Sequence, residues 1–178
     1  MSDLTSRLAT AADLPALRAL MTLAIDRLQD DFLSPEQVAA SHAFMGLDTQ
    51  LIADGTYFMV ECDGRLAGCG GWSRRATLYG GDHSTALRDA ALLDPAKDAA
   101  RVRAMYTHPD FTRRGVGRLI LSLCESAAAA EGYAHVELMG TMSGIPLYRA
   151  TGYTVIEPTE ADVDGVKVPL ARMGKALL

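Results

Sequence analysis

Two glycines, Gly115 and Gly117, stand at the start of an apolar helical pattern in the stretch FTRRGVGRLIL. The first turn of a helix presents unpaired N–H groups and a partial positive charge, and glycine lets a ligand approach that backbone closely. The stretch therefore predicts a phosphate-binding loop. Extra positive charge would come from the neighbouring arginines, Arg113, Arg114 and Arg118. The alternative is structural, because glycines also let a helix pack closely against a sheet.

Other phosphate-binding motifs do not fit this stretch. A GxGxxG fingerprint would need a glycine at Ile120, and GxxxxGK[ST] does not occur in the chain. Dinucleotide-binding and P-loop sites are therefore not indicated.

Composition limits the remaining classes of protein. The chain has 178 residues, 49% of them apolar, and a net charge of −5, which predicts a single domain over residues 1–178 and argues against broad nucleic-acid binding. No apolar run is long enough to cross a membrane, and the N-terminal residues lack a secretory pattern, so we expect a cytoplasmic protein. The cysteines and histidines have no metal-ligand spacing, and we expect no metal and no disulfide.

The first part of the chain reads as a short strand followed by helices. Residues 6–10 form the strand candidate, and Asp13 is the expected N-cap of an amphipathic helix that ends near Leu28. A capping box beginning at Ser34 predicts a second helix, which we expect to end near Gly55.

The pattern then changes to alternating strands. YFMVEC (57–62) and RLAGCGGW (65–72) flank Asp63-Gly64, a pair typical of a two-residue type I′ hairpin. Residues 73–97 follow as a long connection, and such loops in compact domains are usually functional or disordered.

The second half alternates strands with helices. We expect strands at 101–107 and 135–140 on either side of the helix after Gly117, then a short helix at 144–150 and a strand pair at 153–157 and 166–173. Two strands joined through a helix are expected to be parallel. The predicted fold class is α/β (α+β): a mixed, mostly antiparallel sheet with one parallel crossover and helices on both faces.

The stretch from Val102 to Tyr133 resembles the acyl-CoA-binding motif of the GNAT-type N-acetyltransferase superfamily. That family has a loop of the form [R/Q]-x-x-G-x-[G/A] before a helix, and this chain departs from it with Thr112 at the first position. The resemblance implies a GNAT-like fold and acetyl-CoA as acyl donor. It implies pyrophosphate binding by the backbone of Thr112, Arg113, Arg114, Gly115, Val116, Gly117 and Arg118, and pantetheine binding along Met105, Tyr106 and Thr107.

A second resemblance lies near residue 148. Tyr148 stands four residues before the pair Gly152-Tyr153, similar to the late motif of the same family, and Ser143 occupies a cofactor-contacting position where the family often has asparagine. The resemblance implies that Tyr148 is the general acid for the departing thiolate, a task that suits a phenol. The alternative is a tyrosine that only packs in the core.

Two acidic residues are candidates for the general base. Glu61 and Glu137 lie on predicted strands, and either could accept a proton from an amine through water. The alternative is that they form cross-strand ion pairs with Arg101 and Arg103, which share one face of the strand between them. Arginines left unpaired could instead hold a carboxylate on the acceptor.

The function predicted on this basis is acetyl transfer from acetyl-CoA to a primary amine of a small molecule, by direct attack in a ternary complex. A catalytically inactive acyl-CoA-binding sensor or interaction protein is the first alternative, and an arginine-mediated nucleic-acid binder is the second. Exposed apolar strands at the C-terminal end could pair across a two-fold axis and give a homodimer.

Overall fold

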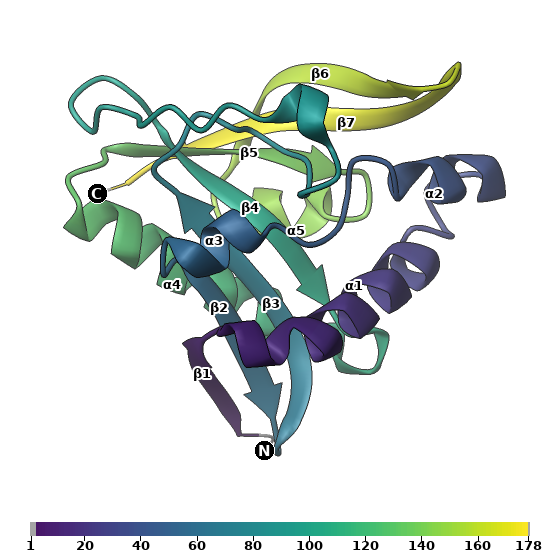
Figure 1. The fold of residues 1–178 in the computed structure, drawn as a ribbon, viewed down its shortest axis with the longest axis horizontal. Coiled ribbons are helices and arrows are strands. Elements are labelled where there is room, and N and C mark those ends of the chain that lie inside the picture. The colour runs from purple at the N-terminus through teal and green to yellow at the C-terminus, as the bar shows by residue number, and fades with distance from the viewer. Residues whose placement is uncertain (1–2, 178) are drawn as a thin grey trace.

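A mixed sheet forms the centre of the molecule in the computed structural model, which describes residues 3–177 (Figure 1). Its strands lie in the order β1-β2-β3-β4-β5-β7-β6, and β4 and β5 are the one parallel pair among the described residues. The predicted fold class is therefore confirmed. The strands are β1 (Leu4–Leu8), β2 (Tyr57–Cys62), β3 (Arg65–Ser73), β4 (Ala100–Thr107), β5 (His135–Thr141), β6 (Thr154–Val163) and β7 (Val166–Ala176).

Helices cover both faces of the sheet (Figure 1). One face carries α1 (Leu14–Leu28), α2 (Pro35–Ser41) and α3 (Thr49–Ala53), and the other carries α4 (Val116–Ala130) and α5 (Ile145–Ala150). In the two longer helices, α1 and α4, apolar residues recur at helical spacing and form one side that packs against the strands. Leu17 in α1 and Ile120 in α4 are completely buried on this side. No helix within residues 3–177 combines the length and the apolar character needed to cross a membrane.

An Asp-Gly pair forms the turn of both the β2–β3 and the β6–β7 hairpin. Asp63 and Gly64 have φ values of 51° and 80°, which confirms the predicted β2–β3 turn with positive φ at both central positions. Asp164 and Gly165 repeat this geometry between β6 and β7, with φ of 50° and 88°. The last two strands are longer than the sequence pattern predicted, because their outer positions are largely exposed and carry little apolar alternation.

The prediction of one helix from Ser34 to Gly55 is wrong. The capping box at Ser34 is present, but α2 ends at Ser41 and α3 begins only at Thr49. Between them Gly46 has a φ of 135°, which is incompatible with a continuous helix, and the Asp48 carboxylate caps α3 by accepting from the Gln50 N–H at 3.1 Å. The interruption places residues 44–48 against the middle of the sheet.

The strands β4 and β5 part soon after they begin to pair. Their described pairing joins Ala100 to Val136 and Arg101 to Glu137, and no further pairs follow within residues 3–177. A bulge at Ala104, with a φ of 52°, shifts the register of β4 on β3, and the Tyr57 hydroxyl donates to the Ala104 carbonyl at 2.6 Å. The last part of β4 therefore has an open backbone edge on the side of β5.

Candidate active site

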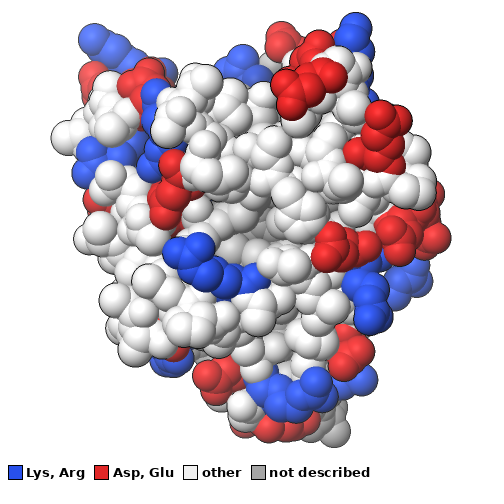
Figure 2. Space-filling model, turned by 45° about the vertical axis from the view of Figure 1, so that its right-hand side comes forward, with Lys and Arg blue, Asp and Glu red and all other residues white. Residues whose placement is uncertain are grey.

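A cavity of about 760 Å³ lies at the open end of β4, between the first turn of α4, α5 and the end of α1. The side of the molecule that carries α1 and α2 comes forward in Figure 2, where a hollow is walled mainly by uncharged side chains with basic side chains at its rim. Most of the predicted cofactor residues line this cavity, namely Met105, Tyr106, Thr107, Thr112, Arg113, Gly115, Val116, Gly117, Arg118 and Ser143. Arg114 does not, since its guanidinium lies 5.5 Å from the centre of the Phe111 ring.

The first turn of α4 presents free backbone donors to this cavity. The first hydrogen bond within the helix runs from the Leu119 N–H to the Gly115 carbonyl at 3.0 Å, so the N–H groups of residues 115–118 are not used inside α4. They lie at the positive end of the helix dipole, where an anion is stabilised. This turn can hold a phosphate.

The two glycines of this turn meet different requirements. Gly115 is the N-cap with a φ of 84°, a conformation that side chains disfavour, and a Cβ on it would meet no atom within 4 Å. A Cβ on Gly117 would lie 2.5 Å from Leu147 Cδ2, so this glycine allows α4 to approach α5. Gly117 therefore serves close packing, against α5 rather than the sheet, while phosphate binding at this turn stays a prediction.

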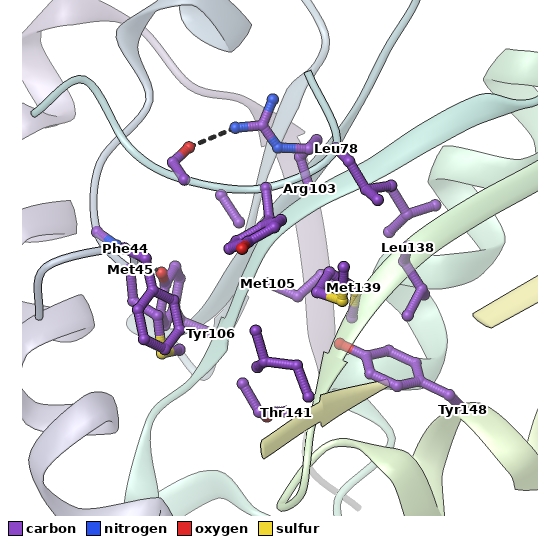
Figure 3. A pocket seen from close by; sticks show the side chains of 16 residues that line it. Phe44, Met45, Leu78, Arg103, Met105, Tyr106, Leu138, Met139, Thr141 and Tyr148 are labelled. Carbon is purple, nitrogen blue, oxygen red and sulfur yellow. Dashed lines mark hydrogen bonds between the residues drawn. The ribbon is translucent and has the colours of Figure 1, made fainter. Parts of the chain in front are cut away.

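A smaller cavity of about 80 Å³ opens between the parted strands β4 and β5 (Figure 3). Two loop segments close it, residues 44–46 before α3 and residues 78–80 in the connection after β3. Met105, Tyr106 and Tyr148 line both this cavity and the larger one, so the two cavities meet at these side chains.

Tyr148 lies at this junction. In Figure 3 its hydroxyl points toward Met105 and Met139. Burial of the ring raises the pKa of Tyr148 to about 12, so the phenol stays protonated at neutral pH and can donate a proton. Gly144 makes room for the ring, because a Cβ there would lie 2.8 Å from Tyr148 Cε2.

The two predicted bases lie outside both cavities. Glu137 is at the paired end of β5, where its Oε2 accepts from Arg101 Nη1 at 3.0 Å and from Arg172 Nη2 at 2.7 Å. Glu61 is near the far end of β2, and its Oε1 lies 4.0 Å from Arg7 Nη2. The prediction that either one is the base does not fit this geometry, whereas the alternative ion pair between Glu137 and Arg101 is present.

Arg103 has a partner that the sequence analysis missed. It is only 4% exposed, and its Nη2 donates to Asp48 Oδ2 at 2.7 Å and to the Gly80 carbonyl. Arg88 binds the same carboxylate through both of its terminal nitrogens, at 2.9 and 3.1 Å. Burial lowers the pKa of Arg103, and the Asp48 carboxylate opposes this by stabilising the charged form. The network ties the long loop of residues 74–99 to β4 and α3.

Parted strands, a helix N-terminus at the mouth of the gap and a buried phenol therefore lie together at one place in the fold. Residues 19–153 match the family model described as Acetyltransferase (GNAT) family. The chain therefore belongs to the GNAT acetyltransferase family, and the predicted resemblance is confirmed.

Solved structures with the same fold cover almost the whole chain. A GCN5-related N-acetyltransferase from Rhodopseudomonas palustris has 19% identity and a TM-score of 0.73 over 99% of this chain and 98% of its own. PaiA N-acetyltransferase from Thermoplasma acidophilum, solved with coenzyme A, has 14% identity and a TM-score of 0.64 over 98% and 99%. YncA from Salmonella typhimurium, solved with acetyl-CoA, has 19% identity and a TM-score of 0.63 over 98% and 94%. No curated protein matches the sequence.

Proposed function

We propose that this protein transfers the acetyl group of acetyl-CoA to a primary amine of a small molecule, by direct attack while both substrates are bound. The observation that carries the proposal is the position of Tyr148, whose side chain lies where the large and small cavities meet. In this proposal the large cavity holds the acyl donor and the small cavity holds the amine.

The larger cavity suits coenzyme A in size and in donor groups. Its volume of about 760 Å³ lies within the range of roughly 300–1,000 Å³ common for ligand sites. The unused N–H groups of residues 115–118 would bind the pyrophosphate. The open edge of β4 from Met105 to Thr107 would pair with the amides of the pantetheine arm as an added strand does.

Acetyl-CoA would supply an activated thioester at the junction of the cavities. Tyr148 would donate its phenolic proton to the departing sulfur, which a protonated phenol of raised pKa can do at neutral pH. The parted strands would position the amine and the thioester together, so that the attack occurs within one complex.

Replacement of Tyr148 by phenylalanine tests the proposal. We expect Tyr148→Phe to lower kcat by about 10²–10⁴-fold, because general acid catalysis is lost, while the Kd for CoA stays unchanged. Thiol release with an amine panel measures the first quantity and calorimetry the second. Tyr133→Phe is the matched control, since Tyr133 is a buried tyrosine that lines neither cavity.

Two outcomes would contradict the proposal. An unchanged kcat in Tyr148→Phe would remove this phenol from the reaction. CoA binding without turnover of any amine by the unsubstituted protein would instead favour the alternative of a catalytically inactive acyl-CoA-binding sensor.

A further inference from the structure

The walls of the small cavity combine apolar side chains with neutral polar groups. Met139 and Leu138 come from β5, Leu170 comes from β7, and Leu78 comes from the long loop (Figure 3). Among the described residues that line this cavity, Arg103 alone carries a charge, and there is no carboxylate. A ligand in this cavity therefore meets hydrocarbon and neutral polar groups on nearly every side.

Arg103 is not free to bind a ligand. Its guanidinium is engaged by the Asp48 carboxylate and by the carbonyls of Gly80 and Thr77, the last at 3.4 Å. Asp48 is 1% exposed and is also held by Arg88, so this one carboxylate pairs with two guanidinium groups. A substrate carboxylate could bind Arg103 only by displacing these partners, because both terminal nitrogens of Arg103 already donate within the protein.

The size of the cavity limits the acceptor further. Its volume of about 80 Å³ is roughly half that of an apolar cavity of ~150 Å³ known to take up benzene. A short alkyl chain fits this volume.

We propose that the acceptor is a monoamine with a short, uncharged alkyl body, and that amines carrying a second charged group are excluded. The inference rests on the proposed acetyl transfer and specifies its substrate class. A second ammonium at the far end of the acceptor would meet no carboxylate among the described residues that line this cavity. A carboxylate there would meet only a guanidinium whose terminal nitrogens are already paired. Burying a charge without a partner is strongly unfavourable.

The same walls provide a way to deprotonate the amine. Removal from water beside the positive charge of Arg103 disfavours the charged form of an amine and lowers its pKa, so the ammonium loses a proton to water as it enters. The neutral nitrogen then forms a bond to the thioester carbon, and the carbon–sulfur bond breaks. Sulfur takes the phenolic proton of Tyr148, and the phenolate takes the remaining extra proton from nitrogen. No carboxylate base is required.

Three four-carbon amines test the substrate class. Butylamine, putrescine and 4-aminobutanoate present the same primary amine and differ at the far end, which is neutral, cationic or anionic. We expect kcat/KM for butylamine to exceed the other two by about 100-fold or more, since a charge costs more than the 10–200-fold effect of one methylene in an apolar pocket. The inference would be overturned if kcat/KM for putrescine, for 4-aminobutanoate or for the N-terminus of a tripeptide equalled or exceeded that for butylamine. Such a result would leave the proposed acetyl transfer itself intact.

A substitution in the long loop tests the same inference from the protein side. Leu78 lines the small cavity, and Leu78→Glu would supply the missing negative charge there, with Leu78→Gln as the neutral control of similar shape. We expect Leu78→Glu to raise the putrescine-to-butylamine ratio of kcat/KM by about 10-fold or more, and Leu78→Gln to leave that ratio unchanged. An unchanged ratio in a folded Leu78→Glu protein would overturn the inference. If the variant does not fold, the amine panel on the unsubstituted protein decides.

Discussion

Thr112 shows how little a single side chain contributes at a site built from backbone. It replaces the arginine or glutamine of the family motif, lines the large cavity and donates weakly from its hydroxyl to the Pro109 carbonyl at 3.4 Å. The N–H groups of residues 115–118 are available whatever stands at this position. A departure from the motif here therefore leaves these N–H groups available to the proposed pyrophosphate.

The pH dependence of the reaction follows from Tyr148. Because its pKa is about 12, the acid stays protonated over the measurable range, and kcat/KM is expected to rise from pH 6 to pH 10 as the neutral fraction of the amine increases. Initial rates over this range check the prediction. A fall in kcat/KM between pH 7 and pH 9 would contradict it.

The glutamates offer a control for this profile. In Glu61→Gln and Glu137→Gln, kcat/KM should still rise from pH 6 to pH 10, because both side chains lie outside the cavities. If this rise disappears in either variant, the substituted glutamate is the base after all.

At the scale of elements, the parting of β4 and β5 creates the small cavity, which is the proposed acceptor site. The bulge at Ala104 bends β4, and the hydroxyl of Tyr57 satisfies the displaced carbonyl. The loop segments 44–46 and 78–80 then close the gap, and the bonds of Arg103 to Asp48 and Gly80 hold them against β4. The small cavity therefore depends on contacts between segments far apart in the sequence.

Asp48→Asn is expected to lower the free energy of unfolding by about 3–5 kcal/mol, because it leaves the buried Arg103 without a counter-charge. Urea denaturation measures the change. The matched control is Glu160→Gln, whose partner Lys167 is exposed, and which should change stability by no more than about 1 kcal/mol. Equal effects of the two substitutions would refute this role of the buried network.

At the scale of the whole molecule, the proposed cofactor bridges the sheet and both helical layers. Its cavity is lined by residues from β4, from the first turns of α4 and α5, and from the end of α1. Val155 and Ile156 on the outer strand β6 are exposed, 38% and 49% respectively, and a homodimer through this edge stays a prediction.

Acetyl-CoA should therefore stabilise the whole fold. At a concentration of 100 times its Kd, acetyl-CoA should raise the free energy of unfolding by about 2.7 kcal/mol. For a chain of this size this corresponds to a rise in Tm of roughly 5–10 °C. A thermal melt with and without the ligand checks this, and ATP, which lacks the pantetheine arm, serves as the control and should give a smaller rise. The absence of any rise with acetyl-CoA would contradict the proposed cofactor.

The sequence by itself determined the order of the elements and the Asp63-Gly64 hairpin, and it predicted an anion-binding turn at Gly115 and a role for Tyr148. These features depend on local signals, namely hydrophobic period, turn residues and short motifs, which act between residues near one another in the chain. Only the tertiary structure decided the break between α2 and α3, the ion pair of Glu137 and the pairing of Arg103 with Asp48. Asp48 and Arg103 are 55 residues apart, and the choice of a buried charge partner depends on which side chains the folded sheet brings together.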